Sequence, residues 1–415
     1  MNYQKSSYLY FLYLLFLFGY IFTHGFYSFF GICLLVIFTI LIIAYIFLDK
    51  KIFKSSDLPS SYFIGKIVLI FSILFSLLLY GGLYQQAGLL KHLSFYLILI
   101  CLVVSILTNN LKKYFYIFLS VYAILGLFMI ISSPEPKIDV FFMLKEGALN
   151  FVNGKNPYNM IFTKIPGGIY NSYAYFPGMI IVTSPIVLIF NDPRYLILFC
   201  QLGTSLLFYK GLNSISISII FLFNPLGLFI LEQSWTDAII FFFVSLFVYL
   251  ILKKRFLFSA LIFGFALSLK QYVILFIPMF WFFIRGRYKY LFTAFLIAAL
   301  LVFPFIIWDF QKFYYGAVGI QTSLPFRRDG LTIISLFYNE FSLNIPFPFL
   351  PIVWFTILIA VYYKINSSNY YIIAIKTFIF IFLFFFINKW AFANYYYLLS
   401  SMFLFSILLK EKEKN

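Results

Sequence analysis

The chain has few charged residues and very few acidic ones. Of its 415 residues, 10% are charged and only 13 are Asp or Glu, whereas 64% are hydrophobic and the mean hydropathy is +1.00. Soluble domains average about 25% charged residues, so this composition excludes an ordinary soluble domain. Because each bilayer crossing takes about 20 apolar residues in a helix, we expect an all-α, multi-pass integral membrane protein with about 12–14 transmembrane spans.

Cysteine and histidine are also scarce. The three cysteines, Cys33, Cys101 and Cys200, lie within or beside apolar runs and show no CxxC spacing, which predicts buried, unpaired thiols. The two histidines, His24 and His92, are far apart in the chain. A histidine-based metal site and a Ser-His-Asp triad are therefore disfavoured.

Basic residues outnumber acidic ones and give a formal net charge of +17. In a soluble protein this excess would indicate a nucleic-acid partner. Here most of it lies in short loops between apolar runs, where it orients helices and meets anionic lipid headgroups. We therefore expect the lipid bilayer, and no nucleic acid, as a partner. The loops assigned to the cytoplasm by their Lys and Arg content are 49–54, 112–113, 253–255, 285–289 and 410–414.

Alternation from these basic loops places three longer loops on the outer, non-cytoplasmic face: 133–175, 309–346 and 388–394. The alternation holds for 1–132 and from 238 onward. Between 176 and 237, however, three apolar runs leave it wrong by one, so one run must not cross. The run 213–230 is the candidate, because Asn224-Pro225 in its middle would break a helix.

The loop 133–175 is a polar island between apolar spans, and it holds Glu135, Asp139 and Glu146. An ionisable group at a membrane costs free energy and indicates a function. Asp139 stands at a natural helix start, where it is either a helix N-cap or a catalytic base.

Residues 140–153 after Asp139 have the pattern of an amphipathic helix lying on the bilayer. Its apolar face is predicted to contain Phe141, Leu144, Ala148 and Val152, and Gly154 is the expected stop.

A series of short motifs follows Asp139. In chain order they are Gly154-Lys155-Asn156-Pro157-Tyr158, Tyr173-Ala174-Tyr175-Phe176-Pro177, Asn224-Pro225 before Trp235-Thr236-Asp237, and Gly264 to Lys270 with Tyr272 and Pro278. Their order and spacing resemble the C-type (GT-C) membrane glycosyltransferases, particularly the polyprenol-phosphate-mannose-dependent mannosyltransferases, over residues 114–409. The chain departs from that family in its four earlier apolar runs, within 8–108, and in having Phe176-Pro177 where a proline pair is common.

The resemblance implies a catalytic module at 114–409, including the outer loop 133–175, between N-terminal helices 1–113 and a cytoplasmic tail 410–415. It implies transfer of a hexose, most often mannose, from a polyprenyl phosphate to a glycan or lipid-linked acceptor at the outer face, with inversion. By the same resemblance, Asp139 activates the acceptor hydroxyl. A carboxylate shielded from water beside lipid has a raised pKa, which makes it a stronger base.

The departing polyprenyl phosphate needs cations, and four approach the outer face by the topology above: Lys270, Arg327, Arg328 and Lys389. For the arginines the alternative is an interfacial anchor or an ion pair with Asp329, and for Lys389 it is snorkelling to the headgroups. Because Lys137-Ile138-Asp139 supplies no second carboxylate, the sequence requires no cofactor, although a divalent metal is not excluded.

Acceptor binding or assistance to the base is assigned to Glu146, Glu232, Asp237, Tyr173 and Tyr175. The carboxylates would accept hydrogen bonds from sugar hydroxyls, and the tyrosines would stack on sugar rings. The alternatives are interfacial solvation for the carboxylates and an aromatic belt for the tyrosines, in a chain that is 24% aromatic.

Two rival functions remain open. A lipid-linked saccharide flippase or small-solute transporter would place ionisable residues near the middle of spans, whereas here the acidic residues cluster at span ends. A structural subunit of a glycan-assembly complex would tolerate the loss of Asp139.

Overall fold

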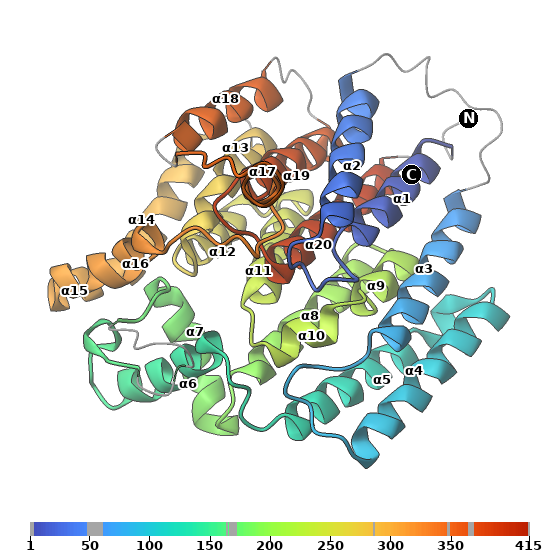
Figure 1. Cartoon of the computed structure of the whole chain (residues 1–415), viewed down its shortest axis with the longest axis horizontal. Helices are drawn as coiled ribbons and strands as arrows, with labels where there is room; N and C mark the ends of the chain where they lie inside the picture. The colour runs from blue at the N-terminus through green and yellow to red at the C-terminus, as the bar shows by residue number, and fades with distance from the viewer. Residues whose placement is uncertain are drawn as a thin grey trace.

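A computed structural model describes residues 4–47, 61–162, 165, 172–284, 287–346, 349–363 and 369–413. Within these ranges the chain is helical, and the one extended pairing described is an isolated bridge between Phe26 and Gly330 (Figure 1). The all-α prediction is therefore confirmed. The predicted basic loop 49–54, Arg285 and Lys414 lie outside the described residues.

The N-terminal helices are α1 (Gln4–Phe18), α2 (Phe29–Phe47), α3 (Ser61–Leu78), α4 (Leu89–Leu107) and α5 (Leu111–Ser132). The next group is α6 (Asp139–Val152), η1 (Pro157–Asn159), α7 (Pro177–Phe190), α8 (Arg194–Leu206) with η2 (Leu207–Gly211), α9 (Ile215–Leu222) and α10 (Gly227–Glu232). Then follow α11 (Asp237–Leu252), α12 (Phe256–Leu267), η3 (Gln271–Phe276), α13 (Ile277–Ile284) and α14 (Tyr288–Trp308). The chain ends with α15 (Phe310–Tyr314), η4 (Tyr315–Gly319), α16 (Ile320–Ser323), α17 (Ile333–Phe341), α18 (Leu350–Tyr362), α19 (Tyr370–Phe386) and α20 (Ala393–Lys412).

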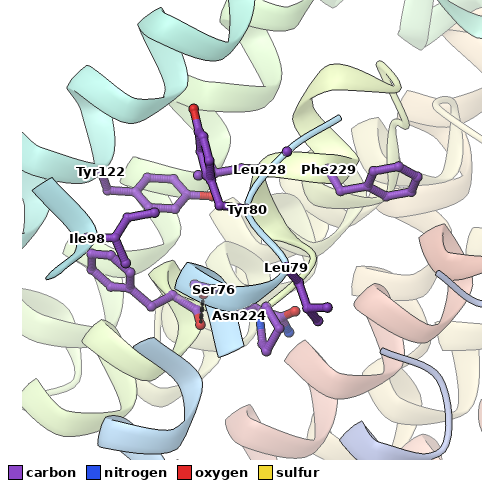
Figure 2. A pocket seen from close by; sticks show the side chains of 11 residues that line it. Ser76, Leu79, Tyr80, Ile98, Tyr122, Asn224, Leu228 and Phe229 are labelled. Carbon is purple, nitrogen blue, oxygen red and sulfur yellow. Dashed lines mark hydrogen bonds between the residues drawn. The ribbon is translucent and has the colours of Figure 1, made fainter. Parts of the chain in front are cut away.

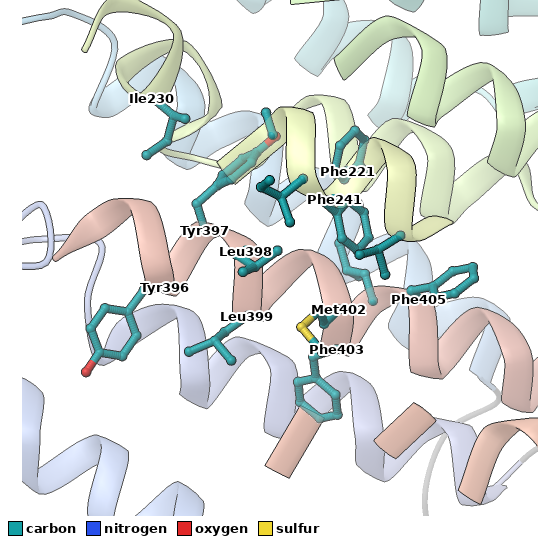
Figure 3. Close-up of a cluster of buried hydrophobic side chains, with 14 of the residues drawn as sticks. Phe221, Ile230, Phe241, Tyr396, Tyr397, Leu398, Leu399, Met402, Phe403 and Phe405 are labelled. Atoms are coloured by element: carbon teal, nitrogen blue, oxygen red, sulfur yellow. The ribbon is translucent and has the colours of Figure 1, made fainter. Parts of the chain in front are cut away.

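Helix α20 forms the centre of the bundle. Nearly all of its side chains from Ala393 to Leu409 are buried, and it contacts α1, α9, α10, α11 and α19. Figure 3 shows Phe403 and Phe405 of α20 in one cluster with Phe241 of α11. A helix that is buried on all sides belongs to a core. This core includes buried residues of α1 and α3. The N-terminal helices, predicted as a separate segment 1–113, therefore pack directly against the rest of the chain.

The outer helices expose apolar faces. Four described helices, α2, α4, α5 and α14, are long and apolar enough to cross a membrane, and α7 with α8, bent by 110°, adds a fifth if the pair is one span. Only 11% of the apolar window of α14 is buried, and Phe292, Leu300 and Ile307 lie exposed on it. Exposed apolar surface of this extent is unusual in water and is compatible with an integral membrane protein. The span count of about 12–14 stays a prediction.

Loops that are distant in sequence meet at one end of the bundle, which we call the polar-loop end. The backbone N–H of Gln86 donates to the carbonyl of Ser132, that of Gly178 to Ser268 and that of Leu331 to Ala391, at 2.8, 2.8 and 2.9 Å. At the opposite, basic end, the Tyr10 hydroxyl of α1 donates to Glu411 of α20 (3.1 Å), and Lys66 donates to Asn109 (2.9 Å). Helices therefore run between two chemically different ends.

Helix α7 is an exception to this pattern, because both of its ends lie at the polar-loop end. Gly178 at its start bonds to Ser268, and the Asn191–Arg194 turn after it bonds to Ser133 at the end of α5. The run 213–230 does break at Asn224-Pro225, between α9 and α10. It nevertheless runs from the basic end to Glu232 at the polar-loop end. Within the bundle, the run 177–190 is therefore the one that does not connect the two ends, and the predicted failure of 213–230 to cross a membrane stays a prediction.

Candidate functional site

A buried ion pair lies at the centre of the polar-loop end. Asp237 is the first residue of α11, where the helix dipole favours a carboxylate. Lys270 is an extended residue between α12 and η3. Its Nζ lies 3.4 Å from Asp237 Oδ2, and the two side chains are 11% and 0% exposed. Two residues that the sequence assigned to the site are therefore in contact, although 33 positions separate them.

Three tyrosine rings surround the Lys270 ammonium. Its Nζ lies 5.6, 5.0 and 5.6 Å from the ring centroids of Tyr175, Tyr272 and Tyr395. Ring faces attract a cation, and more strongly when water is excluded. We call Lys270 and these three rings the tyrosine cage.

Asp237 makes its shorter hydrogen bonds with other partners. The Tyr272 hydroxyl donates to Oδ1 at 2.5 Å, and Asn394 Nδ2 donates to Oδ2 at 3.0 Å. Lys270 makes longer contacts, to Thr236 Oγ1 at 3.2 Å and to Asp237 at 3.4 Å. Asp237 is thus held mainly by neutral donors, and the contacts of the Lys270 ammonium with Thr236 and Asp237 are longer.

Asp139 lies next to the tyrosine cage. It is half-buried at the start of α6, and its Oδ1 accepts a hydrogen bond from the Val140 N–H at 2.8 Å. Burial raises the pKa of the Tyr175 phenol well above its usual value, and the nearby carboxylates of Asp139 and then Asp237 raise it further. Tyr175, whose ring faces Lys270, therefore lies within electrostatic range of both carboxylates. The N-cap position itself is Ile138, which makes no side-chain cap.

The helix predicted after Asp139 is confirmed as α6, Asp139–Val152. It buries Phe141, Leu144 and Ala148 as expected. Val152, the fourth residue of the predicted apolar face, is 45% exposed. Gly154 follows at φ +71°, a left-handed conformation that glycine adopts without strain, and ends the helix.

The tyrosines of the island are packed inside the protein. Tyr173 and Tyr175 are 0% and 8% exposed, and their ring centroids lie 5.7 Å apart. The Tyr158 hydroxyl donates to the Tyr175 carbonyl at 2.6 Å. Tyr173 is thus packed in the protein interior, and the ring of Tyr175 faces Lys270. Neither ring has the open face that the sequence prediction of sugar stacking requires.

Glu232 is fully buried, and its carboxylate is occupied by the chain itself. Oε2 accepts from the Leu83 N–H at 2.7 Å and from Gln233 Nε2 at 2.9 Å, and Oε1 accepts from the Tyr84 N–H at 3.0 Å. These contacts favour an anchoring role over the predicted acceptor binding. Glu146 is half-buried about two turns beyond Asp139 on α6.

Lys389 is also occupied by backbone groups. Its Nζ donates to the carbonyls of Gln321, Thr322 and Leu324, at 3.0, 3.3 and 2.6 Å. A lysine there neutralises the carbonyl end of α16, and burial lowers the pKa of its ammonium. This geometry caps a helix and leaves little capacity for the predicted phosphate contact.

The two arginines of the outer loop differ from each other. Arg327 makes a bidentate pair with Asp329, at 2.8 Å from Nε and 2.6 Å from Nη2, and this pair lowers the pKa of the Asp329 carboxyl. Arg328 is exposed and lines an open groove of about 460 Å³. The other lining residues are Pro325, Phe326, Tyr338, Asn344, Ile345 and Pro346. Arg328 therefore faces open space, whereas Arg327 is paired with Asp329.

Sequence reasoning missed a second buried ion pair, Asp192–Arg194. Arg194 is fully buried, and its Nη2 lies 2.6 Å from Asp192 Oδ2. Nη1 donates to Ser133 Oγ at 2.9 Å, and the guanidinium lies 5.3 Å from the Phe141 ring centroid. The pair therefore joins α5, α6 and the α7–α8 turn beside Asp139. The helix start at Asp192-Pro193 was its only sequence signal.

A small cavity lies below the loop that joins α3 to α4. Figure 2 shows the side chains that line it, including Ser76, Tyr122 and Asn224, from α3, α5 and the α9–α10 break. Its volume of about 10 Å³ is about the space that one water molecule needs. It is too small for a sugar.

Among the described residues, no group of three His, Cys, Asp or Glu side chains is arranged to hold a metal ion. Comparisons of the chain with protein-family models, curated proteins and solved structures found no match.

Proposed function

We propose that the protein is a membrane glycosyltransferase that moves a hexose from a polyprenyl phosphate to a hydroxyl of a glycan or lipid-linked acceptor. The observation that carries this proposal is the buried Lys270–Asp237 pair inside the tyrosine cage, one ring of which, Tyr175, lies near the Asp139 carboxylate. This arrangement supplies a base and a cation near one aromatic ring. The chemistry of hexosyl transfer from a lipid phosphate needs both.

In the proposed step, the acceptor oxygen attacks the anomeric carbon while the bond from that carbon to the phosphate oxygen breaks. Asp139 takes the proton from the acceptor hydroxyl, and the electron pair of the broken bond leaves with the polyprenyl phosphate. The departing phosphate gains negative charge, which Lys270 stabilises through its ammonium. Attack opposite the leaving group gives inversion.

The contacts favour a smaller set of phosphate-binding cations than the sequence alone. Lys270 is held loosely, and Arg328 faces an open groove. Arg327 and Lys389 are bonded to Asp329 and to carbonyls. We therefore assign the phosphate to Lys270, with Arg328 as the second candidate cation.

The proposed membrane placement puts the polar-loop end outside the cytoplasm. Described loops at the opposite end carry Lys112-Lys113 and Lys253–Arg255, as expected of cytoplasmic loops. With α6 and α7 lying along the outer face, the remaining long runs connect the two ends. This supports a span count near the upper part of the range of about 12–14.

The test is a comparison of two isosteric substitutions in the same loop. Asp139→Asn keeps the shape of the side chain but removes the base, so we expect release of polyprenyl phosphate to fall by about 10²–10⁴-fold. Glu135→Gln removes an exposed carboxylate four residues earlier and should leave turnover unchanged. Equal activity of Asp139→Asn and the wild type, at equal folded yield, would remove Asp139 from the mechanism.

A further inference from the structure

The loop 79–88, between α3 and α4, belongs to the N-terminal helices but lies at the polar-loop end. Its two central amides, Leu83 and Tyr84, both donate to the buried Glu232 carboxylate. A charge-assisted hydrogen bond of this kind is stronger than one between neutral groups. Glu232 therefore anchors the loop.

Gly82 lets the loop backbone pack closely against the Glu232 carboxylate. A Cβ atom added at Gly82 would overlap the Glu232 carboxylate, whereas one added at Gly88, in the same loop, would meet nothing within 4 Å. Leu79 and Tyr80 of the loop close over the small cavity beside Leu228 and Phe229 of α10 (Figure 2). The loop is thus fixed against α10 at several points.

The anchored loop also contacts the segment that precedes Asp139. The Tyr84 hydroxyl donates to the Lys137 carbonyl at 2.8 Å, and the Gln86 N–H donates to Ser132. The Ile138 N–H donates to Pro136 at 2.8 Å, which makes a tight turn just before Asp139. Tyr84 therefore holds the outer side of the turn that aims Asp139.

Electrostatics keep the Tyr84 hydroxyl available as a donor. Burial raises the pKa of this phenol, and the carboxylates of Glu232 and then Asp139 raise it further. The phenol thus keeps its proton through neutral pH and continues to donate to Lys137. It also lies near both carboxylates.

We propose that the loop 79–88 is a positioning element of the active site, with Glu232 as its anchor and Tyr84 as the residue that orients Asp139. This inference rests on the proposed glycosyl transfer. The N-terminal helices are then part of the catalytic unit, and Glu232 acts through the loop, without contacting the acceptor. Tyr84 is a positioning residue, because its hydroxyl touches the turn before Asp139.

Two matched pairs of variants test this role in the full-length protein in lipid nanodiscs. Gly82→Ala should displace the loop from the Glu232 carboxylate, and Gly88→Ala is its control. Tyr84→Phe removes the hydroxyl that holds Lys137, and Tyr62→Phe removes one that donates to the Asn109 carbonyl at the basic end. Amide hydrogen exchange at Leu83 and Tyr84 reports whether these amides still bond to Glu232, independently of activity.

We expect Gly82→Ala to raise exchange at Leu83 and Tyr84 and to lower kcat by at least tenfold, with both controls unchanged. Tyr84→Phe should lower kcat about tenfold with KM unchanged, because a misaimed base slows the chemical step without weakening binding. A loop that is released while kcat stays normal would overturn the positioning role and leave the proposed transferase intact. A wild-type protein that is inert with every polyprenyl-phosphate hexose would overturn both.

Discussion

The contributions of Lys270 to folding and to turnover can be separated by substitution. Removing one partner of a buried ion pair costs about 3–5 kcal/mol, because the other charge is left without compensation. Here Tyr272 and Asn394 still hold the Asp237 carboxylate, at 2.5 and 3.0 Å. We therefore expect Lys270→Met to lower the free energy of unfolding by about 3 kcal/mol, at the lower end of that range.

The effect on turnover should be larger than this loss of stability explains. An ammonium 4 Å from a phosphate charge contributes about 4 kcal/mol at an effective dielectric constant of 20. Loss of one preorganised donor to a developing charge typically costs about 10²–10³-fold in kcat. We expect a fall of that size in the folded fraction of Lys270→Met.

The assay combines denaturant unfolding in detergent with release of polyprenyl phosphate per folded molecule. Adding Asp237→Asn to Lys270→Met removes both charges and should restore about 2 kcal/mol of stability without restoring turnover. Lys376→Met on α19 is the control, because Lys376 is buried to the same extent as Lys270. If folded Lys270→Met retained more than a tenth of wild-type kcat, Lys270 would be a structural residue and the reasoning would be wrong.

Three further predictions concern the surroundings of the site. Arg194→Ala should lower the free energy of unfolding by about 3–5 kcal/mol, because it leaves the buried Asp192 carboxylate without its cation. Arg194→Lys should lose only part of this stability, and denaturant unfolding measures both variants. Lys389→Met should destabilise the protein by about 1–2 kcal/mol through its lost carbonyl bonds while KM for the donor stays unchanged, and a raised KM would instead make it a phosphate ligand. The pKa of Asp329 is lowered in the fold, so its pair with Arg327 stabilises above about pH 4 and is lost as pH falls through the lowered pKa. Because this pair is exposed, Asp329→Asn should cost less than about 1 kcal/mol at pH 7, and the difference in unfolding should vanish in acid.

The sequence predicted the helical class, the helix after Asp139 and the gathering of Asp237 and Lys270 at one end. Composition and helical spacing are local properties, so they survive folding unchanged. The basic segments around Lys253 and Lys412 do lie near each other at one end of the bundle, and the membrane face of that end stays a prediction. These predictions rest on patterns that each segment carries by itself.

The misassigned features depend on contacts between distant segments. An apolar run such as 177–190 has the same composition whether it crosses the bundle or lies along its end, and the break at Pro225 does not show that 213–230 connects the two ends. Lys389 and Glu232 look equally available in sequence, because nothing there shows that the carbonyls of α16 or the amides of loop 79–88 will occupy them. Arg194 was overlooked for the same reason.

The most direct test of the central claim is incubation of the purified protein with radiolabelled polyprenyl-phosphate hexoses and a panel of glycan and lipid-linked acceptors. The account predicts that polyprenyl phosphate and an inverted glycoside form in equal amounts, and that Asp139→Asn abolishes both. Formation of neither product by the folded wild-type protein, or equal formation by Asp139→Asn, would contradict it.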